Sequence, residues 1–349
     1  MSHEIRTPMN VVLGMLQPLK DTPLDRSQLF YVDTVASSGK SLLTVINDIL
    51  DYARIESGKL SLEQIEFDLE QLISETTNLF TAQALEKRLR LYVCLEAGVP
   101  QYIIGDPIRI KQVLMNLLSN AIKFTAEGYV SLNIRRSDNQ QGQAQVLFSI
   151  RDSGIGISPE GQALLFKSFA QGDSSMTRRY GGSGLGLAIS KELVTMMNGD
   201  IALQSNLSQG SVFTFDLPLQ QNPERDDSLT RLLNGRTALL TSLDGQGLDV
   251  LELLLKRWGM HTERCQTPER LLSCLTTFST PPLLVLISPW PGSITGWLDP
   301  VQAHLQLGQP ILLLCPPAQT AQQPHYPALN IQSLPQPLTV SELRTTLFE

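Results

Sequence analysis

Two glycine clusters, the first opened by an acidic residue, are the part of this sequence best suited to chemistry. The first is residues 152–156 (DSGIG) and the second is residues 181–187 (GGSGLGL). Glycine lets the backbone approach a ligand closely and adopt positive φ. The second cluster leads directly into a helical pattern, and N–H groups at such a junction bind phosphate well. With the polar segment 172–180 between them, the clusters predict a nucleotide pocket closed by a mobile lid.

A second group of residues lies on one predicted helix. Asn116 and Asn120 are four residues apart, and Lys123 follows three residues later, so all three share a helix face. Asparagine is a poor choice for a helix interior. The row is either a solvated polar face, or a ligand-facing row whose amide oxygens hold Mg²⁺ and whose ammonium group meets a phosphate. The spacing alone favours neither interpretation.

The elements around these groups predict an α/β sandwich. Asp106 and Pro107 begin the helix that carries the asparagines, as N-cap and first helical residue. Further helices are expected at 69–85 and 185–197, and strands at 62–67, 89–95, 129–135, 146–152, 201–205 and 211–217. A Rossmann unit is excluded, because the glycines lack its Gly-x-Gly-x-x-Gly helix and downstream acid.

The N-terminal residues predict two helices. The first runs from Ser2 to about Lys20, and Asp25 is expected to cap the second, which ends at Ser57-Gly58. Apolar or small residues recur on the second helix at heptad spacing: Val32, Val35, Gly39, Leu42, Ile46, Ile49 and Ala53. A hairpin cannot bury such a seam alone, so we expect a dimeric four-helix bundle. The alternative is a hairpin packed on its own downstream domain.

The C-terminal third predicts a different fold. Residues 220–234 are polar and include Pro223, which is typical of a linker. Beyond them, short apolar strands alternate with helices, as in a doubly wound parallel sheet. The expected strands are 238–241, 261–264, 283–287 and 310–314, and the expected helices are 247–258, 268–276 and one after Pro337.

Composition narrows the class of protein. The 349 residues carry a net charge of −7, which argues against nucleic acid as an obligatory partner. No apolar run approaches the roughly 20 residues that span a bilayer, and no signal peptide is recognisable at the start. The cysteines Cys94, Cys265, Cys274 and Cys315 show no Cys-x-x-Cys spacing, so buried reduced thiols in a cytoplasmic protein are expected.

Together these motifs give the chain a likeness to a known family. It resembles the transmitter core of hybrid sensor histidine kinases over essentially its whole length. Residues 2–8 (SHEIRTP) look like the family's phosphoacceptor box, and residues 116–124 (NLLSNAIKF) look like its N box. Residues 152–156, the Phe166/Phe169 pair and residues 182–186 (GSGLG) look like its D, F and second glycine boxes.

The resemblance implies a multidomain fold of the α+β and α/β classes. A helical-hairpin dimerisation and phosphotransfer domain would span 1–59, and a Bergerat-type α/β-sandwich ATP-binding domain would span 60–219. After the linker 220–234, a flavodoxin-like receiver-type domain would span 235–349.

The resemblance also implies roles for single residues. His3 would take the γ-phosphoryl group of ATP on an imidazole nitrogen, while Glu4 orients the ring or accepts its proton. Thr7, one turn later, matches the position that aligns water when such proteins remove phosphate from a partner. Asp152 would accept the adenine amino group, and Asn120 would ligate Mg²⁺. The residues implied around ATP are Asn116, Asn120, Lys123, Asp152, Gly154, Gly156, Phe169, Gly182, Gly184, Leu185 and Gly186.

Two features depart from the family near the N-terminus. Only Met1 and Ser2 precede His3, which places the histidine in the first, fraying turn of its helix. We therefore expect either a fragment of a longer sensor or a truncated protein with weakened autophosphorylation. Pro18 is expected to kink or shorten the first helix.

The C-terminal domain departs from the family in its chemistry. Where a receiver carries acidic residues, a phosphoacceptor aspartate, a hydroxyl and a lysine, this chain has Ser242 and Leu243, Ser288, Cys315 and Gln336. Asp244 is one position late. Without the carboxylate cluster we expect no Mg²⁺ site and no phosphorylation at Ser288, so the domain is a degenerate receiver with a docking or regulatory role.

The leading hypothesis is an ATP-dependent histidine kinase. It would act as a homodimer through its helical hairpin, hand its phosphoryl group to a response regulator or phosphotransfer protein, and reach a membrane only through an upstream sensor region. A rival is a regulatory pseudokinase that heterodimerises with an active sensor kinase through the seam 32–53. A chaperone- or topoisomerase-type ATPase is disfavoured, because such proteins lack the box around His3.

Overall fold

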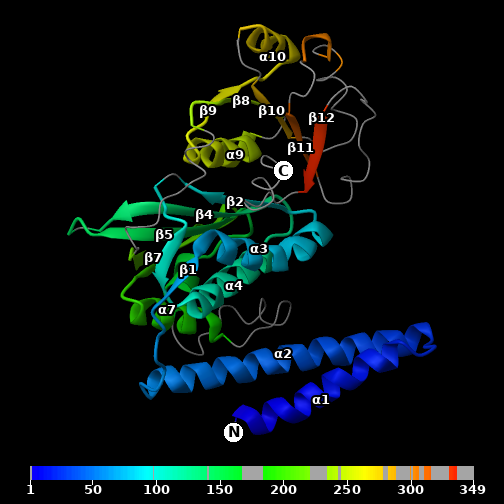
Figure 1. The fold of residues 1–349 in the computed structure, drawn as a ribbon. Coiled ribbons are helices and arrows are strands. Elements are labelled where there is room, and N and C mark those ends of the chain that lie inside the picture. The colour runs from blue at the N-terminus through cyan, green and yellow to red at the C-terminus, as the bar shows by residue number, and fades with distance from the viewer. Residues whose placement is uncertain are drawn as a thin grey trace. The chain divides into compact units, whose positions relative to one another are not determined.

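The computed structural model describes residues 2–96, 98–139, 141–166, 184–220, 234–242, 245–277, 282–287, 299, 302–305, 310–315 and 330–335. The chain falls into two units, each described by itself below. The first comprises residues 1–62 and 159–196, and the second comprises residues 63–158 and 197–349. Figure 1 labels the elements along the chain.

The first unit begins with a helical hairpin of α1 (Ser2–Lys20) and α2 (Arg26–Glu56). The predicted cap at Asp25 is confirmed: its carboxylate accepts N–H bonds from Ser27 and Gln28, both 2.8 Å, and the Gln28 side chain accepts the Asp25 N–H at 2.9 Å. Pro18 lies in the last turn of α1, and it does not end the helix, which continues to Lys20.

The heptad seam of α2 is only partly covered. Val32 and Gly39 are buried, and a Cβ at Gly39 would lie 2.8 Å from Cδ2 of Leu13 on α1. In contrast, Val35 and Leu42 are 47% and 49% exposed. The single hairpin therefore leaves part of its apolar seam open. The same unit contains the short α5 (Pro159–Gln162) and α7 (Gly186–Met196), and α7 contacts α2.

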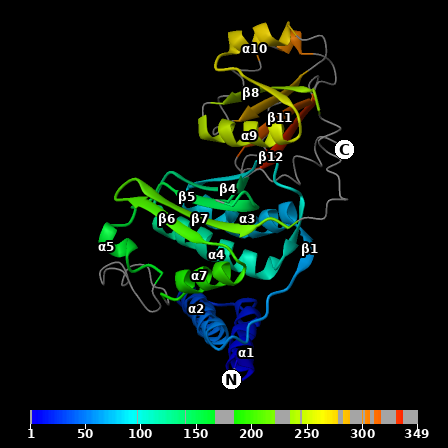
Figure 2. The same ribbon diagram turned by 90° about the vertical axis from the view of Figure 1, so that its left-hand side faces the viewer.

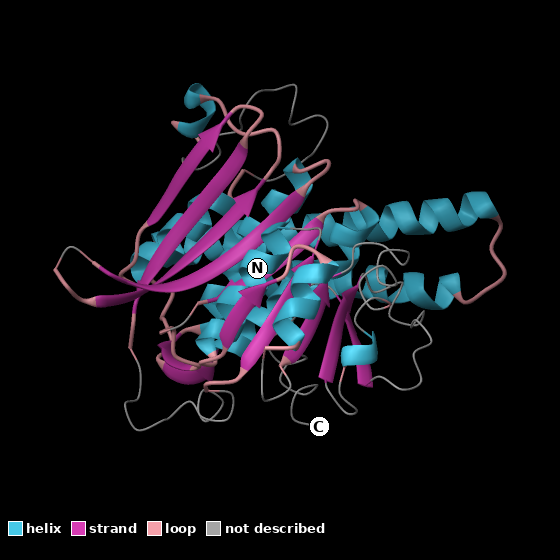
Figure 3. Ribbon diagram, turned by 90° about the horizontal axis from the view of Figure 1, so that it is seen from above, coloured by secondary structure: helices cyan, strands magenta, loops and turns pink. Residues whose placement is uncertain are grey.

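The second unit contains a five-stranded sheet in the order β2-β4-β5-β7-β6. Figure 3 distinguishes the strands, in magenta, from the helices, in cyan. Its strands are β2 (Arg90–Leu95), β4 (Tyr129–Asp138), β5 (Ala144–Asp152), β6 (Ile201–Asn206) and β7 (Gly210–Pro218). β2 pairs with β4 in parallel, and the other pairs are antiparallel. At the centre, the buried rings of Phe148 and Phe215 stack at 4.5 Å between centroids.

Two helices, α3 (Leu69–Glu86) and α4 (Pro107–Phe124), lie on one face of this sheet (Figure 2). Asp106 caps α4 as predicted, since its carboxylate accepts the Arg109 N–H at 3.0 Å. α4 buries an apolar stripe against the core: Ile110, Val113, Leu114, Leu117, Leu118, Ala121 and Ile122. The sequence reading had no strand at β3 (Tyr102–Gly105), which pairs with β1 (Ile65–Asp68) as a separate antiparallel ribbon.

The same unit also holds a second five-stranded sheet, in the order β12-β11-β10-β8-β9, and every pair is parallel. The predicted parallel sheet is therefore confirmed. Its elements are β8 (Thr237–Ser242), α9 (Gly245–Arg257), β9 (His261–Arg264), α10 (Pro268–Leu275), β10 (Leu283–Ile287), the 3-10 turn Gln302–His304, β11 (Pro310–Cys315) and β12 (Asn330–Pro335).

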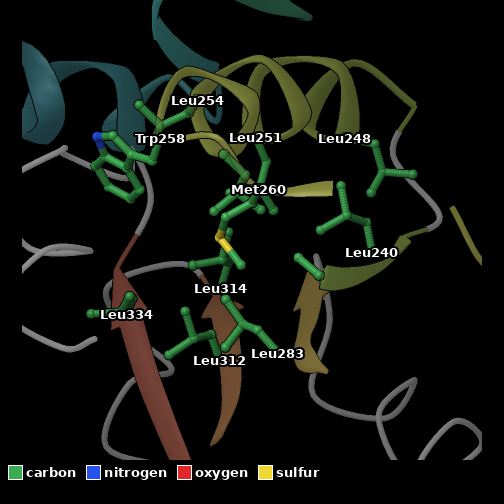
Figure 4. Packing of buried hydrophobic residues seen from close by; sticks show 12 residues of the cluster. Leu240, Leu248, Leu251, Leu254, Trp258, Met260, Leu283, Leu312, Leu314 and Leu334 are labelled. Atoms are coloured by element: carbon green, nitrogen blue, oxygen red, sulfur yellow. The ribbon is translucent and has the colours of Figure 1, made fainter. Parts of the chain in front are cut away.

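Both faces of this parallel sheet are buried. Figure 4 shows one face, where Leu251 and Met260 lie between α9 and the strands. On β8, Leu240 joins this cluster, whereas Leu239 joins the opposite one together with α10. Alternate residues thus enter two cores, as expected for a doubly wound sheet.

Several sequence-based expectations concern residues outside the described ranges. These include most of the linker 220–234, the helix after Pro337, and the receiver positions Leu243, Asp244, Ser288 and Gln336. Ser242 and Cys315 end β8 and β11 respectively. Cys94, Cys265 and Cys274 are buried free thiols, as predicted. None of the helices within the described ranges has the length and hydropathy of a membrane span.

Candidate functional site

The polar row of α4 is half-buried beside the apolar stripe of the same helix. Asn120 donates an amide hydrogen to Oδ1 of Asn116 at 3.3 Å, so this bond uses Nδ2 of Asn120 rather than its carbonyl oxygen. Burial lowers the pKa of Lys123 from its ordinary value of 10.5, and its ammonium group lies 5.1 Å from the centre of the Phe124 ring. The row therefore combines amide oxygens with a partly desolvated cation.

Asp152 ends β5 and is only 5% exposed. Its Oδ1 accepts the Gly154 N–H at 2.9 Å, and the backbone and hydroxyl of Ser211 on β7 also bond to the carboxylate. Burial raises the pKa of Asp152 above its ordinary value of 3.8, and these hydrogen bonds oppose the rise. Asp152 is thus a buried acceptor held in a fixed orientation.

The glycines of the 152–156 loop are required by the packing of the loop itself. A Cβ at Gly154 would lie 2.4 Å from the Phe124 carbonyl oxygen. Gly156 has φ +68°, and a Cβ there would lie 1.9 Å from the Asn206 carbonyl oxygen. Sequence reasoning assigned these glycines to ligand approach, and the structure adds a local steric reason for both.

This loop lies against the C-terminal end of α4, since the Ile155 N–H donates to the Phe124 carbonyl oxygen at 3.4 Å. The fold therefore brings the Asp152 loop and the Asn116–Lys123 row together, although their sequence positions are about thirty residues apart. A buried acceptor and a polar row are thus placed at the same end of one helix.

Sequence reasoning missed Lys87, which caps α4 from outside. Its ammonium group donates to the carbonyl oxygens of Ile122 at 2.7 Å, Lys123 at 3.0 Å and Thr125 at 3.4 Å. These carbonyl groups belong to the helix end that lacks intrahelical partners, where a cation is also favoured by the helix dipole. Lys87 thus fixes the end of α4 that holds the Asp152 loop.

The remaining predicted residues belong to the first unit. His3 and Glu4 lie in the first turns of α1, and Thr7 is exposed one turn later; side chains are described from Thr7 onward. Phe169 and Gly182 lie outside the described residues. The predicted site residues of the second unit thus lie together, whereas His3, Glu4 and Thr7 belong to the first unit.

The described part of the second glycine cluster forms a helix start. Gly184 has φ +69°, and Leu185 is 1% exposed. The Leu185 carbonyl oxygen accepts the Ile189 N–H at 2.8 Å, and Gly186 is the first residue of α7. The predicted junction between loop and helix is confirmed here.

The donor set of α4 fits a magnesium–nucleotide complex. Within the described residues, no group of three or more His, Cys, Asp or Glu side chains could hold a metal by itself. Mg²⁺ in nucleotide sites is held largely by phosphates and water with few protein ligands, so a single amide oxygen from Asn120 suits it.

Two protein families match the chain. The "His Kinase A (phospho-acceptor) domain" matches residues 1–58, and the "Histidine kinase-, DNA gyrase B-, and HSP90-like ATPase" matches residues 105–221. The chain belongs to the sensor histidine kinases. The phosphoacceptor match covers His3, and the ATPase match covers both α4 and the Asp152 loop.

Individual sensor kinases are similar over much of the chain. Sensor protein GacS of Pseudomonas syringae pv. syringae is 38% identical over 286 residues, which are 82% of this chain and 32% of that protein. Signal transduction histidine-protein kinase BarA of Escherichia coli (strain K12) is 41% identical over 223 residues, 64% of this chain and 24% of that protein. The chain thus spans about a third or less of these relatives.

A solved structure resembles almost the whole chain. The crystal structure of full-length ShkA in complex with AMPPNP matches with a TM-score of 0.76 and 29% sequence identity. The match covers 99% of this sensor histidine kinase chain and 70% of the ShkA chain. The likeness extends beyond the two matched families into the C-terminal third.

Proposed function

We propose that this sensor histidine kinase binds ATP with Mg²⁺, phosphorylates its own His3, and passes the phosphoryl group to an aspartate of a response regulator or phosphotransfer protein. The observation that carries the proposal is the junction of the Asp152 loop with the end of α4, within the matched ATPase family. A structure of the similar ShkA contains AMPPNP, an ATP analogue, which supports adenine nucleotide as the ligand.

Each residue of the second unit has a physical task in binding. The buried Asp152 accepts the adenine amino group and so selects the base. Asn120 offers its amide oxygen to Mg²⁺, and Asn116 holds that amide in position. Lys123 places positive charge beside the phosphates. Mg²⁺, when bound with ATP, neutralises charge on the phosphoryl groups, and positioning with charge neutralisation accounts for most catalysis of phosphoryl transfer.

The transfer step uses the box at the start of α1. A neutral imidazole nitrogen of His3 forms a bond to the γ-phosphorus as the bond from phosphorus to the β–γ bridging oxygen breaks. ADP leaves with that electron pair, and Glu4 receives the imidazole proton. In phosphatase action on a partner, which is a separate reaction, Thr7 orients the water that hydrolyses the partner's aspartyl phosphate to aspartate and inorganic phosphate. Gly182, Gly184, Leu185 and Gly186 of the second glycine cluster, and Phe169 of the F box, are the further residues that we propose for ATP binding.

We also propose that the chain acts as a homodimer through its hairpin. The exposed part of the α2 seam, which includes Val35, Leu42 and Ile49 at 47%, 49% and 47% exposure, supports a second hairpin as the partner. An exposed apolar face of this length is typical of an interaction surface.

The proposed domain boundaries are 1–59, 60–219, 220–234 and 235–349, with the last a flavodoxin-like receiver-type domain. Its parallel sheet supports this assignment, because β8 lies between β9 and β10 in the strand order of that doubly wound fold. Ser242, where a receiver carries an acidic residue, supports a domain that takes no phosphoryl group.

The decisive experiment measures incorporation of ³²P from γ-labelled ATP into this chain and into the variant His3→Gln. We expect acid-labile, base-stable label on the wild type and none on the variant. If neither protein is labelled although both bind ATP, the chain is instead a regulatory pseudokinase. If the wild type fails to bind adenine nucleotide, the proposal is wrong.

A further inference from the structure

Strand β2 is buried on both of its faces. Its register with β4 places Leu91, Val93 and Leu95 opposite buried β4 residues, so these three side chains face the shared core with α3 and α4. The alternate residues Tyr92 and Cys94 therefore face the other side of the sheet. They are nevertheless only 8% and 2% exposed. A further element must cover this side of β2.

The covering element is α9 of the parallel-sheet domain. It contacts β2, and the Cys94 thiol donates to the Val250 carbonyl oxygen at 3.9 Å. Burial raises the pKa of Cys94 to about 12. Leu251 points from α9 toward the strands of its own domain, as Figure 4 shows. Val250 lies outside that cluster, on the part of α9 that meets β2.

A buried guanidinium group lies at the end of the same helix. The side chain of Arg257 is 2% exposed, and its Nη2 lies 2.7 Å from Oε1 of Glu70, which is itself 10% exposed. Nη1 donates to the Glu96 carbonyl oxygen at 3.2 Å. Glu70 is in the first turn of α3, and Glu96 follows β2, so both partners lie outside the parallel-sheet domain.

The arrangement of Arg257 makes its burial dependent on this contact. The Nη2–Oε1 pair is close, but it lacks the direction of a hydrogen bond, and Nε also has no partner within the described residues. A buried charge with incomplete hydrogen bonding is costly, and its opposite charge is the main compensation. Removing Glu70 would leave Arg257 as an uncompensated buried cation.

We propose that α9 is an intramolecular docking helix, which closes the outer side of the ATPase sheet at β2 and is latched by Arg257 on Glu70. The occupant of this surface is the C-terminal domain of the same chain. Glu70, Cys94 and Glu96 belong neither to the polar row of α4 nor to the Asp152 loop, so the contact is separate from the proposed nucleotide site. It gives a domain without receiver chemistry a defined position on the kinase.

The test uses the whole chain without nucleotide and measures alkylation of each cysteine by iodoacetamide, resolved by mass spectrometry. Glu70→Gln and Arg257→Met should each accelerate alkylation of Cys94 at least about tenfold, because loss of one partner of a buried ion pair strongly favours opening. Cys265 and Cys274 lie within the parallel-sheet domain and should stay protected. The matched control is Lys256→Met, because the Lys256 side chain is 53% exposed at the adjacent position of α9.

The charge exchange Glu70→Arg with Arg257→Glu should return the Cys94 rate toward that of the wild type. An unchanged Cys94 rate in Glu70→Gln overturns the proposal, since that variant alters no residue of the C-terminal domain. An equal acceleration in Lys256→Met also overturns it. If Arg257→Met exposes Cys265 and Cys274 as well, it has unfolded its own domain, and Glu70→Gln then decides.

Discussion

The variant Asp152→Asn tests the proposed base recognition without removing the local structure of the loop. The asparagine keeps one side-chain carbonyl oxygen to accept the Gly154 N–H, which Asp152 accepts at 2.9 Å. Its other side-chain atom becomes an N–H donor, and two donors then face each other where the carboxylate met the adenine amino group. A hydrogen bond to a charged group contributes about 1.5–3 kcal/mol. Affinity for ATP should therefore fall roughly 10- to 150-fold.

The same change should alter the choice of base. Guanine carries a carbonyl oxygen where adenine carries the amino group, and the new amide N–H can donate to it. GTP affinity should therefore rise while ATP affinity falls, so the ratio of ATP to GTP affinity should fall further than ATP affinity alone. Isothermal titration calorimetry with both nucleotides in the presence of Mg²⁺ measures the ratio directly.

Asp216→Asn is the matched control for this experiment. Asp216 also lies on the sheet with a pKa raised by burial, and it accepts bonds from Gln145 and Asp200. Asp216 lies five residues along β7 from Ser211, which is a distance of about 17 Å along the strand. Its exchange should leave nucleotide binding unchanged. The reasoning is refuted if Asp152→Asn binds ATP as tightly as the wild type, or if both variants weaken ATP equally.

Three further predictions concern the same elements. Burial raises the pKa of Asp152, so ATP affinity should fall as the pH drops through a value above 3.8 and the carboxylate is protonated. Burial lowers the pKa of Lys123, so ATP affinity should also fall as the pH rises through a value below 10.5 and the ammonium group loses its charge. Binding titrations at a series of pH values measure both effects. Lys87→Met should lower the free energy of unfolding by about 0.3–1 kcal/mol, as measured by denaturant unfolding, and weaken ATP binding a few-fold, as measured by calorimetry. The control Arg88→Met should change neither quantity. Asp25→Ala should remove the capping box of α2 and cost about 1 kcal/mol of hairpin stability in thermal unfolding, and no loss would show the cap to be redundant.

Local signals explain how much of the fold could be predicted from the sequence. Asp25 and Asp106 were recognised as caps because a cap bonds to N–H groups two or three residues away. The strands of the C-terminal sheet were recognised because a doubly buried parallel strand is a continuous apolar run. In contrast, β3 offers only three apolar, β-prone residues before Gly105, a run too short to identify a strand. Its strand character becomes evident from its pairing with β1, about forty residues earlier.

The same distinction separates the parts of the site. The spacing of Asn116, Asn120 and Lys123 along the sequence is enough to predict that they share one face of α4. The contact of Lys87 with the Ile122 carbonyl group joins residues 35 positions apart, and that of Arg257 with the Glu96 carbonyl group joins residues 161 positions apart. A lysine or arginine on a helix is usually solvated, so only the folded chain reveals these partners.

The glycine motif illustrates why Asp152 rather than Gly154 or Gly156 should carry the functional test. Exchange of Gly156 for alanine would place a methyl group 1.9 Å from the Asn206 carbonyl oxygen, so the loop must move whether or not nucleotide binds there. Loss of activity in that variant would agree equally well with a binding role and with a purely structural one. Asp152→Asn alters the direction of a hydrogen bond at nearly constant volume. The bonds from Gly154 and Ser211 can respond to that change too, but they do so equally with either nucleotide. A change in the choice between adenine and guanine, with opposite sign for the two, therefore reports the contact with the base.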